Sequence, residues 1–167
     1  MRISWLLAIG LILTITSIQC AVTRYVAPAT MTVHVIDSLV RSIDDNEQLV
    51  ETFRTGTVGN TGKLKTYFLK DTFTNQLYRV RYVESLDTAD NTAYYYYQGK
   101  LVFADVRRVD QTTDTRKIIY NCLYYFRNDS ILAAIDEDLT YSNPKEVLKL
   151  GNIFYHRTNT KPLKRKS

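Results

Sequence analysis

Residues 94–103 read YYYYQGKLVF, and this stretch decides the fold. Four tyrosines precede the pair Gln98-Gly99, and the aliphatic residues Leu101 and Val102 follow it. Aromatic and β-branched side chains are typical of strands, and a very short connection that contains glycine is typical of a β-hairpin. The stretch therefore predicts two antiparallel strands joined by a tight turn.

The same arrangement occurs on both sides of this hairpin. The flanking copies are Tyr67-Phe68, which leads through a turn to Leu77-Tyr78, and Tyr125-Phe126, which leads through Asn128-Asp129 to Ile131-Leu132. The second and third copies are offset by 29 or 30 residues. A general likeness among hairpins explains two copies as well as a repeated unit does, but it explains three copies less well. Three consecutive hairpins predict an antiparallel meander.

Outward from the hairpins, side chains alternate with period two between Leu64 and Asp136. Six strands are expected, near residues 64–70, 76–84, 92–97, 100–108, 116–127 and 130–136. Residues 47–54 are open between a helix and a strand. Glu51 and Phe53 fit the alternation of a strand, but Val50 and Phe53 also continue a helical pattern from the residues before them. A helix that ends near Asn46 is favoured.

Helical patterns flank the strands. The apolar residues between Met31 and Asp45 recur at helical spacing: Val35, Ile36, Leu39, Val40 and Ile43. Near the C-terminus, Asn143-Pro144 combines an N-cap residue with proline at the first helical position. An apolar face of Val147, Leu150 and Phe154 follows, and Gly151 either weakens this helix or lets it approach the sheet closely. We therefore expect an α+β fold, with an antiparallel meander sheet of about six strands and an N-terminal and a C-terminal helix packed on one face.

The first residues have the pattern of a secretory signal. Arg2 precedes an apolar run and a more polar segment that ends at Cys20. The apolar run is shorter than the roughly 20 residues that a spanning helix needs, although an uncleaved anchor is an alternative. Cleavage after Cys20 or Ala21 is one outcome, and lipid attachment to Cys20 is the other. The stretch 17–20 resembles the box before a bacterial lipoprotein cysteine, with Gln19 where that box has a small residue.

The chain of 167 residues divides accordingly. We expect a signal peptide at 1–20, an extended lead-in at 21–30, a single α+β domain at 31–156 and a basic flexible tail at 157–167. Apolar residues make up 45% and charged residues 23%, which is typical of a globular domain. The net charge of +5 resides in Arg2 and in four cations of the last seven residues, so the folded body is neutral. A neutral body argues against nucleic acid as a partner.

The sequence holds no recognised catalytic, metal or nucleotide motif. The only two histidines, His34 and His156, lie at opposite ends of the domain. Cys122 is expected to be a small buried apolar group, with a reactive thiol as the alternative, and no disulfide is expected. No cofactor is expected either. The sequence thus favours a non-catalytic binding or structural module, and the alternative is a small secreted hydrolase with an unrecognised site.

The hairpins resemble those of a group of uncharacterised small exported bacterial proteins. If Cys20 is lipidated, this resemblance implies a lipoprotein. Their repeated motif is Tyr-Tyr-Phe-x-Asn-Gly-Lys-Leu-Ile. The matching stretches here are 95–102, with Gln98 in place of asparagine, and 124–132, which lacks the glycine. The resemblance implies the fold and an exported location, periplasmic or extracellular, and it implies no chemistry.

One face of the sheet is the best candidate for a binding surface. Because side chains alternate along a strand, Tyr95 and Tyr97 must point away from Tyr94 and Tyr96. If both helices cover one face, aromatic side chains stay exposed on the other, near arginines, and such a mixture is typical of recognition surfaces. The candidate surface comprises Tyr95, Tyr97, Tyr125, Arg79 and Arg81. The alternative is that tyrosine simply tolerates a half-wet sheet face. The expected partner is an envelope protein or a glycan, and membrane contact is expected only through the signal segment or a lipid on Cys20.

Overall fold

The computed structural model describes residues 31–58, 62–85, 88–110, 112, 117–136 and 143–159. Its elements, in chain order, are α1 (Val33–Asp44), β1 (Leu49–Val58), β2 (Gly62–Asp71), β3 (Leu77–Ser85), β4 (Thr88–Tyr97), β5 (Lys100–Asp110), β6 (Lys117–Arg127), β7 (Ser130–Asp136) and α2 (Pro144–Asn159). The expected signal peptide, the lead-in, Cys20 and most of the basic tail lie outside the described residues.

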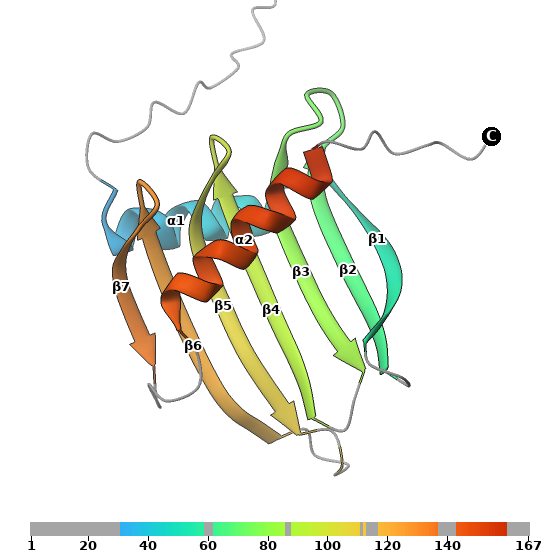
Figure 1. Ribbon diagram of the computed structural model, residues 1–167. Coiled ribbons are helices and arrows are strands. Elements are labelled where there is room, and N and C mark those ends of the chain that lie inside the picture. The colour runs from blue at the N-terminus through green and yellow to red at the C-terminus, as the bar shows by residue number, and fades with distance from the viewer. Residues whose placement is uncertain are drawn as a thin grey trace, which may run out of the picture.

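The sheet is an antiparallel meander in which each strand pairs with its neighbours in the chain, from β1 to β7 (Figure 1). This confirms the predicted α+β class. The sheet has seven strands rather than about six, because residues 47–54 fall in β1 and its approach. β1 pairs with β2 along its whole length, from Leu49 opposite Asp71 to Val58 opposite Gly62. The helix before it ends at Asp44, close to the expected end near Asn46.

The three predicted hairpins are built alike, although the first has a longer connection, residues 72–76, than the two-residue turns of the others. In two of them, both turn residues have positive φ: Gln98 (50°) with Gly99 (82°), and Asn128 (51°) with Asp129 (59°). This is the type I′ geometry, whose twist matches that of the flanking strands. Each hairpin also carries one β-bulge near the start of its second strand, at the equivalent residues Tyr78, Val102 and Leu132.

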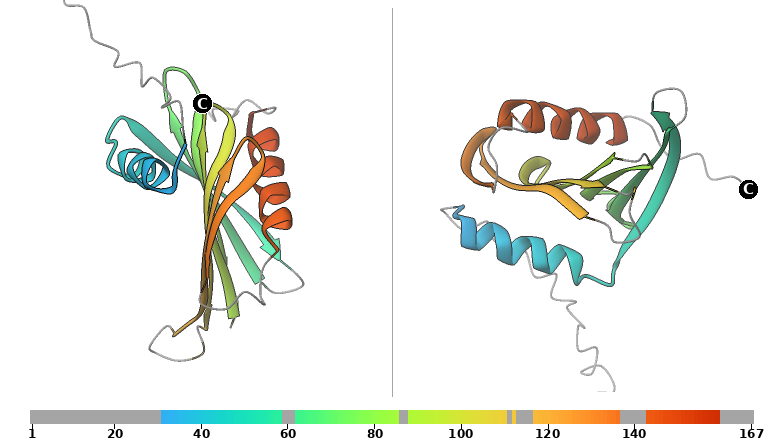
Figure 2. Two further views of the ribbon diagram at one scale, coloured as in Figure 1. Left: turned by 90° about the vertical axis from the view of Figure 1, so that its left-hand side faces the viewer. Right: turned by 90° about the horizontal axis from the view of Figure 1, so that it is seen from below.

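The helices lie on opposite faces of the sheet, which corrects the expectation that both would pack on one face (Figure 2). Ile36 and Leu39 of α1 pack on a cluster with Tyr95, and Val147 of α2 packs on a separate cluster with Tyr96. The physical reason is the uninterrupted aromatic run that ends β4. It places large rings on both faces, and each face then needs a cover.

Specific residues fix α2 at its start and along the face that contacts the sheet. The Asn143 side chain accepts a hydrogen bond from the Lys145 amide (3.0 Å), as expected of an N-cap before Pro144. Gly151 allows α2 to approach the sheet, because a Cβ there would lie 2.7 Å from Leu101 Cδ2. Within the described residues, neither helix is long and apolar enough to cross a membrane.

Candidate functional site

The predicted aromatic surface is covered rather than open. Tyr95 is 7% exposed and Tyr125 is 3% exposed, and both lie under α1. Tyr97 is half-buried at the edge of the same cluster. The rings of Tyr95 and Tyr125 flank Phe103, with ring centroids 5.6 and 5.0 Å apart. This aromatic row belongs to the core between the sheet and α1, so it offers no free face to a partner.

The hydroxyl groups of this row are bonded to α1. Tyr125 donates to Asp37 (2.9 Å) and Tyr95 donates to Asp44 (3.0 Å). Asp37 and Asp44 are seven residues apart, a helical rise of about 10.5 Å. Tyr95 and Tyr125 stand on β4 and β6, and two strand spacings amount to about 9.6 Å. The two distances match, so α1 crosses the strands with both tyrosines bonded.

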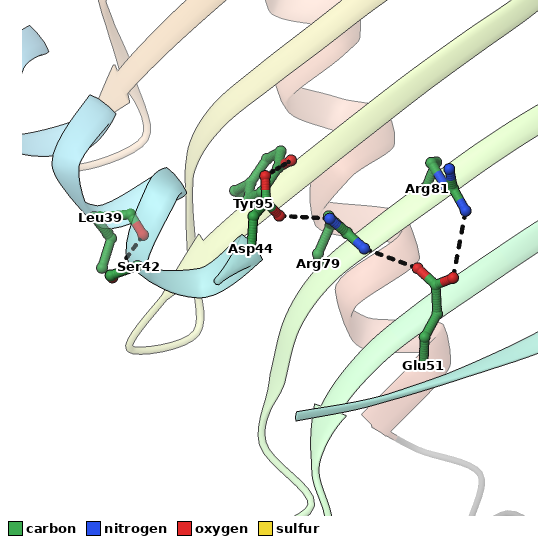
Figure 3. Close-up of polar contacts among 7 residues, drawn as sticks. All are labelled: Leu39, Ser42, Asp44, Glu51, Arg79, Arg81 and Tyr95. Atoms are coloured by element: carbon green, nitrogen blue, oxygen red, sulfur yellow. Dashed lines mark hydrogen bonds and ion pairs between the residues drawn. The ribbon is translucent and has the colours of Figure 1, made fainter. Parts of the chain in front are cut away.

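The predicted arginines join the same helix to the sheet through an ion-pair network (Figure 3). Arg79 binds Asp44 of α1 and also Glu51 of β1, the latter at 2.8 Å between Nη2 and Oε1. Arg81 binds the other Glu51 oxygen at 3.3 Å, and its guanidinium lies 4.4 Å from the centre of the Tyr67 ring. Two cations face two carboxylates, so this network is electrically balanced.

A cavity lies on the opposite face, between α2 and strands β3 to β6. Its volume is about 310 Å³. We call it the α2 cavity; it is lined by Tyr82, Asp90, Thr92, Tyr94, Val106, Arg108, Tyr120, Asn143, Glu146, Val147, Leu150 and Phe154. Its size is at the lower end of the range of about 300–1,000 Å³ that is typical of small-molecule sites.

An ion pair forms the polar wall of the α2 cavity. Arg108 binds Asp90 with two parallel contacts, Nε to Oδ1 at 2.6 Å and Nη2 to Oδ2 at 2.9 Å. The two residues are direct partners across β4 and β5. The Arg108 guanidinium also lies 5.4 Å from the centre of the Tyr120 ring. The hydrogen bonds to Asp90 raise the pKa of Arg108, so the guanidinium stays charged, and its charge is balanced by the carboxylate that it binds.

Aromatic rings form the rest of the wall. Phe154 of α2 lies against Tyr82 and Tyr94, with ring centroids 6.0 and 5.6 Å apart. The Tyr82 hydroxyl donates to Glu84. Burial raises the pKa of Tyr82 and of Tyr94 well above the usual range, so both hydroxyls keep their protons at neutral pH. The exposed side chains of Glu146 and Leu150 lie on the α2 side of the cavity.

The other groups considered in the sequence lie away from this cavity. His34 is exposed on α1 and His156 is exposed near the end of α2, on opposite sides of the sheet. Cys122 is fully buried in the core beneath α2. Among the residues that the structure describes, no group of three or more histidine, cysteine or acidic side chains is placed to hold a metal ion.

Sequence analysis did not single out the α2 cavity. Asp90 and Arg108 are eighteen positions apart, and each lies in a strand of otherwise ordinary composition. The available signal was the register of the hairpin. Counting residues outward from the Gln98-Gly99 turn places Asp90 beside an arginine of the partner strand.

The structure thus defines an α+β domain whose meander sheet carries one helix on each face and an aromatic cavity under α2. Comparisons of the chain with protein-family models, with curated proteins and with solved structures found no match.

Proposed function

We propose that the protein is an exported, non-catalytic binding module of the cell envelope and that its α2 cavity binds a glycan. The observation that carries this proposal is the composition of the cavity wall. It joins several aromatic rings to a charge-balanced ion pair and neutral hydroxyl groups, with the Glu146 carboxylate on the α2 side.

A saccharide fits such a wall. A sugar ring presents C–H bonds on its faces and hydroxyl groups around its edge. Tyr82, Tyr94 and Phe154 supply flat apolar surfaces, while the hydroxyls of Tyr82 and Tyr94 and the Asp90–Arg108 pair supply donors and acceptors around them. Because the charges of Asp90 and Arg108 balance and Glu146 adds one carboxylate, the cavity favours a neutral polar ligand over an anionic one.

The electrostatics support binding over hydrolysis. A general acid or base works best with a pKa near the working pH. In the α2 cavity, burial raises the pKa of Tyr82 and Tyr94 and the Asp90 hydrogen bonds raise that of Arg108, so these three pKa values lie even further from neutral pH than in an exposed side chain. These three groups therefore act as fixed donors and acceptors at neutral pH.

Titration of the full chain with soluble envelope glycan fragments, followed by NMR or calorimetry, tests the proposal. Tyr82→Phe removes one hydroxyl from the cavity wall and should weaken glycan binding about fivefold, since a hydrogen bond contributes about 1 kcal/mol. Tyr78→Phe is the matched control, because Tyr78 lies four residues earlier in β3 but packs on the α1 side. It should leave the affinity unchanged.

Two results would overturn the glycan assignment. One is a lack of saturable binding by any fragment while the protein stays folded, as judged by its melting temperature. The other is an equal loss of affinity in Tyr78→Phe, which would place the bound ligand outside the α2 cavity.

A further inference from the structure

β1 forms one edge of the sheet, and its outer side is long and open (Figure 1). Among the described strands it pairs only with β2, over ten residues and without a register shift. Natural edge strands are usually protected by proline, by a bulge, by outward charges or by a short length. β1 has neither proline nor a bulge, whereas β7, the opposite edge strand, has only seven residues and carries a bulge. The backbone groups on the outer side of β1 are therefore ready to pair with another strand.

The two charged side chains of β1 are drawn back over the sheet. Glu51 binds Arg79 and Arg81 of β3, which lies two strands further in (Figure 3). Arg54 lies over the ring of Phe68 of β2, with 5.5 Å between the guanidinium carbon and the ring centre. These contacts hold both charges away from the open edge, so they form no barrier to a strand that approaches from outside.

An exposed aromatic ring lies near the middle of β1. Phe53 is 62% exposed on the face that carries α1, where its ring centre lies 5.9 Å from that of Tyr67. Val50 is 46% exposed and lies on the opposite face, because side chains alternate along a strand. A strand that pairs with β1 therefore covers apolar surface on both faces. The residues that contribute most to binding cluster near the centre of an interface, which is the position that Phe53 has in this strand.

We propose that β1 pairs reversibly with β1 of a second copy of this chain, in antiparallel orientation and with Phe53 on the two-fold axis. The two sheets then join into one continuous sheet. This interface includes no residue of the α2 cavity, so it does not depend on the glycan assignment.

Symmetry and charge select this register. A two-fold axis perpendicular to the sheet keeps the same face of both copies on one side, so opposite residues must have the same facing. With Phe53 on the axis, its ring meets the Phe53 ring of the second copy. Glu51 then lies opposite Thr55, and residues 49–57 pair, which is almost the whole strand. An axis at Glu51 or at Arg54 would instead place two like charges opposite each other, which destabilises a strand pair.

A second copy matches this edge better than an unrelated strand does. Paired strands of ten residues exchange about eight to ten backbone hydrogen bonds, close to the roughly ten direct hydrogen bonds of a typical interface. In the register around Phe53, each copy also supplies the aromatic ring that covers the other. Pairing of β1 with β7 of another copy is a poorer match, because β7 is shorter and bulged and the resulting assembly would not close.

Disulfide trapping tests the register directly. The starting chain carries Cys20→Ser, and its remaining cysteine, Cys122, is fully buried. Phe53→Cys in this chain should form a covalent dimer under mild oxidation. Opposite residues of antiparallel strands have Cα atoms about 4.5–5.5 Å apart, which is within the range of a disulfide.

The matched control is Thr55→Cys in the same Cys20→Ser chain. Thr55 is exposed on the same face of the same strand, but in this register the Thr55 residues of the two copies lie about 14 Å apart along the strands. It should therefore cross-link at least about tenfold more slowly.

Sedimentation of the full chain at a series of concentrations tests the contribution of the ring. Phe53→Lys removes both rings and places two cations on the axis, so it should weaken dimerisation at least about tenfold. Phe73→Lys is the matched control, because Phe73 is 95% exposed but lies in the β2–β3 connection. It should leave dimerisation unchanged. Association through the apolar first residues is common to all these chains and cancels in the comparison.

Four results would overturn the proposal. Equal cross-linking of Phe53→Cys and Thr55→Cys would indicate random collisions. A chain that stays monomeric over its whole soluble range, while its melting temperature shows that it is folded, would leave the edge without a second copy. Equal association of Phe53→Lys and Phe73→Lys would place the contact elsewhere. A ladder of larger species in place of a dimer would indicate pairing of β1 with β7 of the next copy.

Discussion

Tyr95 shows how a single hydroxyl links folding to pH. Burial, aided by the Asp44 carboxylate, raises the pKa of Tyr95 to about 12, against about 10 for an exposed tyrosine. A group whose pKa is raised by folding contributes stability that is fully present below its unfolded pKa. That contribution is lost as the pH rises through the folded value. The relevant window is therefore pH 10 to 12.

We predict that Tyr95→Phe flattens the loss of stability in this window. The variant should lose about 1 kcal/mol at neutral pH, because the hydrogen bond to Asp44 is gone. Between pH 10 and 12 its free energy of unfolding should fall by roughly 2 kcal/mol less than that of the wild type. Urea unfolding at a series of pH values measures both effects. Equally steep curves for the two proteins would contradict the assignment.

Gly151 provides a second prediction at the residue scale. In an exposed helix, alanine in place of glycine stabilises by about 1 kcal/mol. Here a Cβ would lie 2.7 Å from Leu101 and 3.0 Å from Tyr94, and the Gly151 carbonyl also accepts the Tyr96 hydroxyl at 2.8 Å. Gly151→Ala should therefore destabilise the protein by about 1–3 kcal/mol in urea. Lys149→Ala, at an exposed position of the same helix, should change stability little; a stabilised Gly151→Ala protein would refute the close approach.

The α2 cavity shows why a site can escape sequence analysis when the strands do not. A two-residue turn at Gln98-Gly99 places Asp90 opposite Arg107 by simple counting. The bulge at Val102 moves the register by one, so the observed partner is Arg108. Nothing in the composition around Val102 marks the bulge, and this one-residue shift decides which arginine reaches the cavity.

At the scale of elements, the third hairpin carries an avoidable strain. Asp129 has φ of 59° in a type I′ turn, where its counterpart in the second hairpin is Gly99. Asp129→Gly should stabilise the protein by about 0.5–1 kcal/mol, because glycine adopts this conformation without steric cost. Ser130→Gly, one residue later at the start of β7, should destabilise it instead. Thermal unfolding of the two variants distinguishes them, and a shift of the same sign in both would contradict the turn assignment.

The strands of the hairpins could be predicted well from the sequence, but the sheet face that each helix covers could not. The aromatic entries and short turns of β2 to β7 are local signals, so they appear directly in the sequence. β1 was ambiguous because it is an edge strand whose side chains from Val50 to Thr57 are exposed, which leaves no buried stripe to set a period. The face of the sheet on which each helix packs is set by tertiary contacts. Its one signal was the four-tyrosine run, which lacks the polar alternation of a half-exposed strand.

At the scale of the whole molecule, burial predicts a gradient of stability across the sheet. β4, β5 and β6 contribute to the clusters under both helices, whereas β1 is exposed. Amides of β5 should exchange with deuterium at least about tenfold more slowly than those of β1, since local opening is easiest where little apolar surface is buried. Native-state hydrogen exchange followed by mass spectrometry measures this. Uniform protection from β1 to β5 would show that the sheet opens only as one unit.

The order of pairing in the sheet has a consequence for how the chain is made. Each strand pairs with the segment synthesised just before it. A nascent chain can therefore form one hairpin at a time, and no strand stays unpaired until a distant segment is made. Only α2, the last described element, must reach back across several earlier strands. Closure of the core under α2 is therefore the step that continued synthesis can delay, and until it happens the rings of Tyr96 and Tyr124 face water.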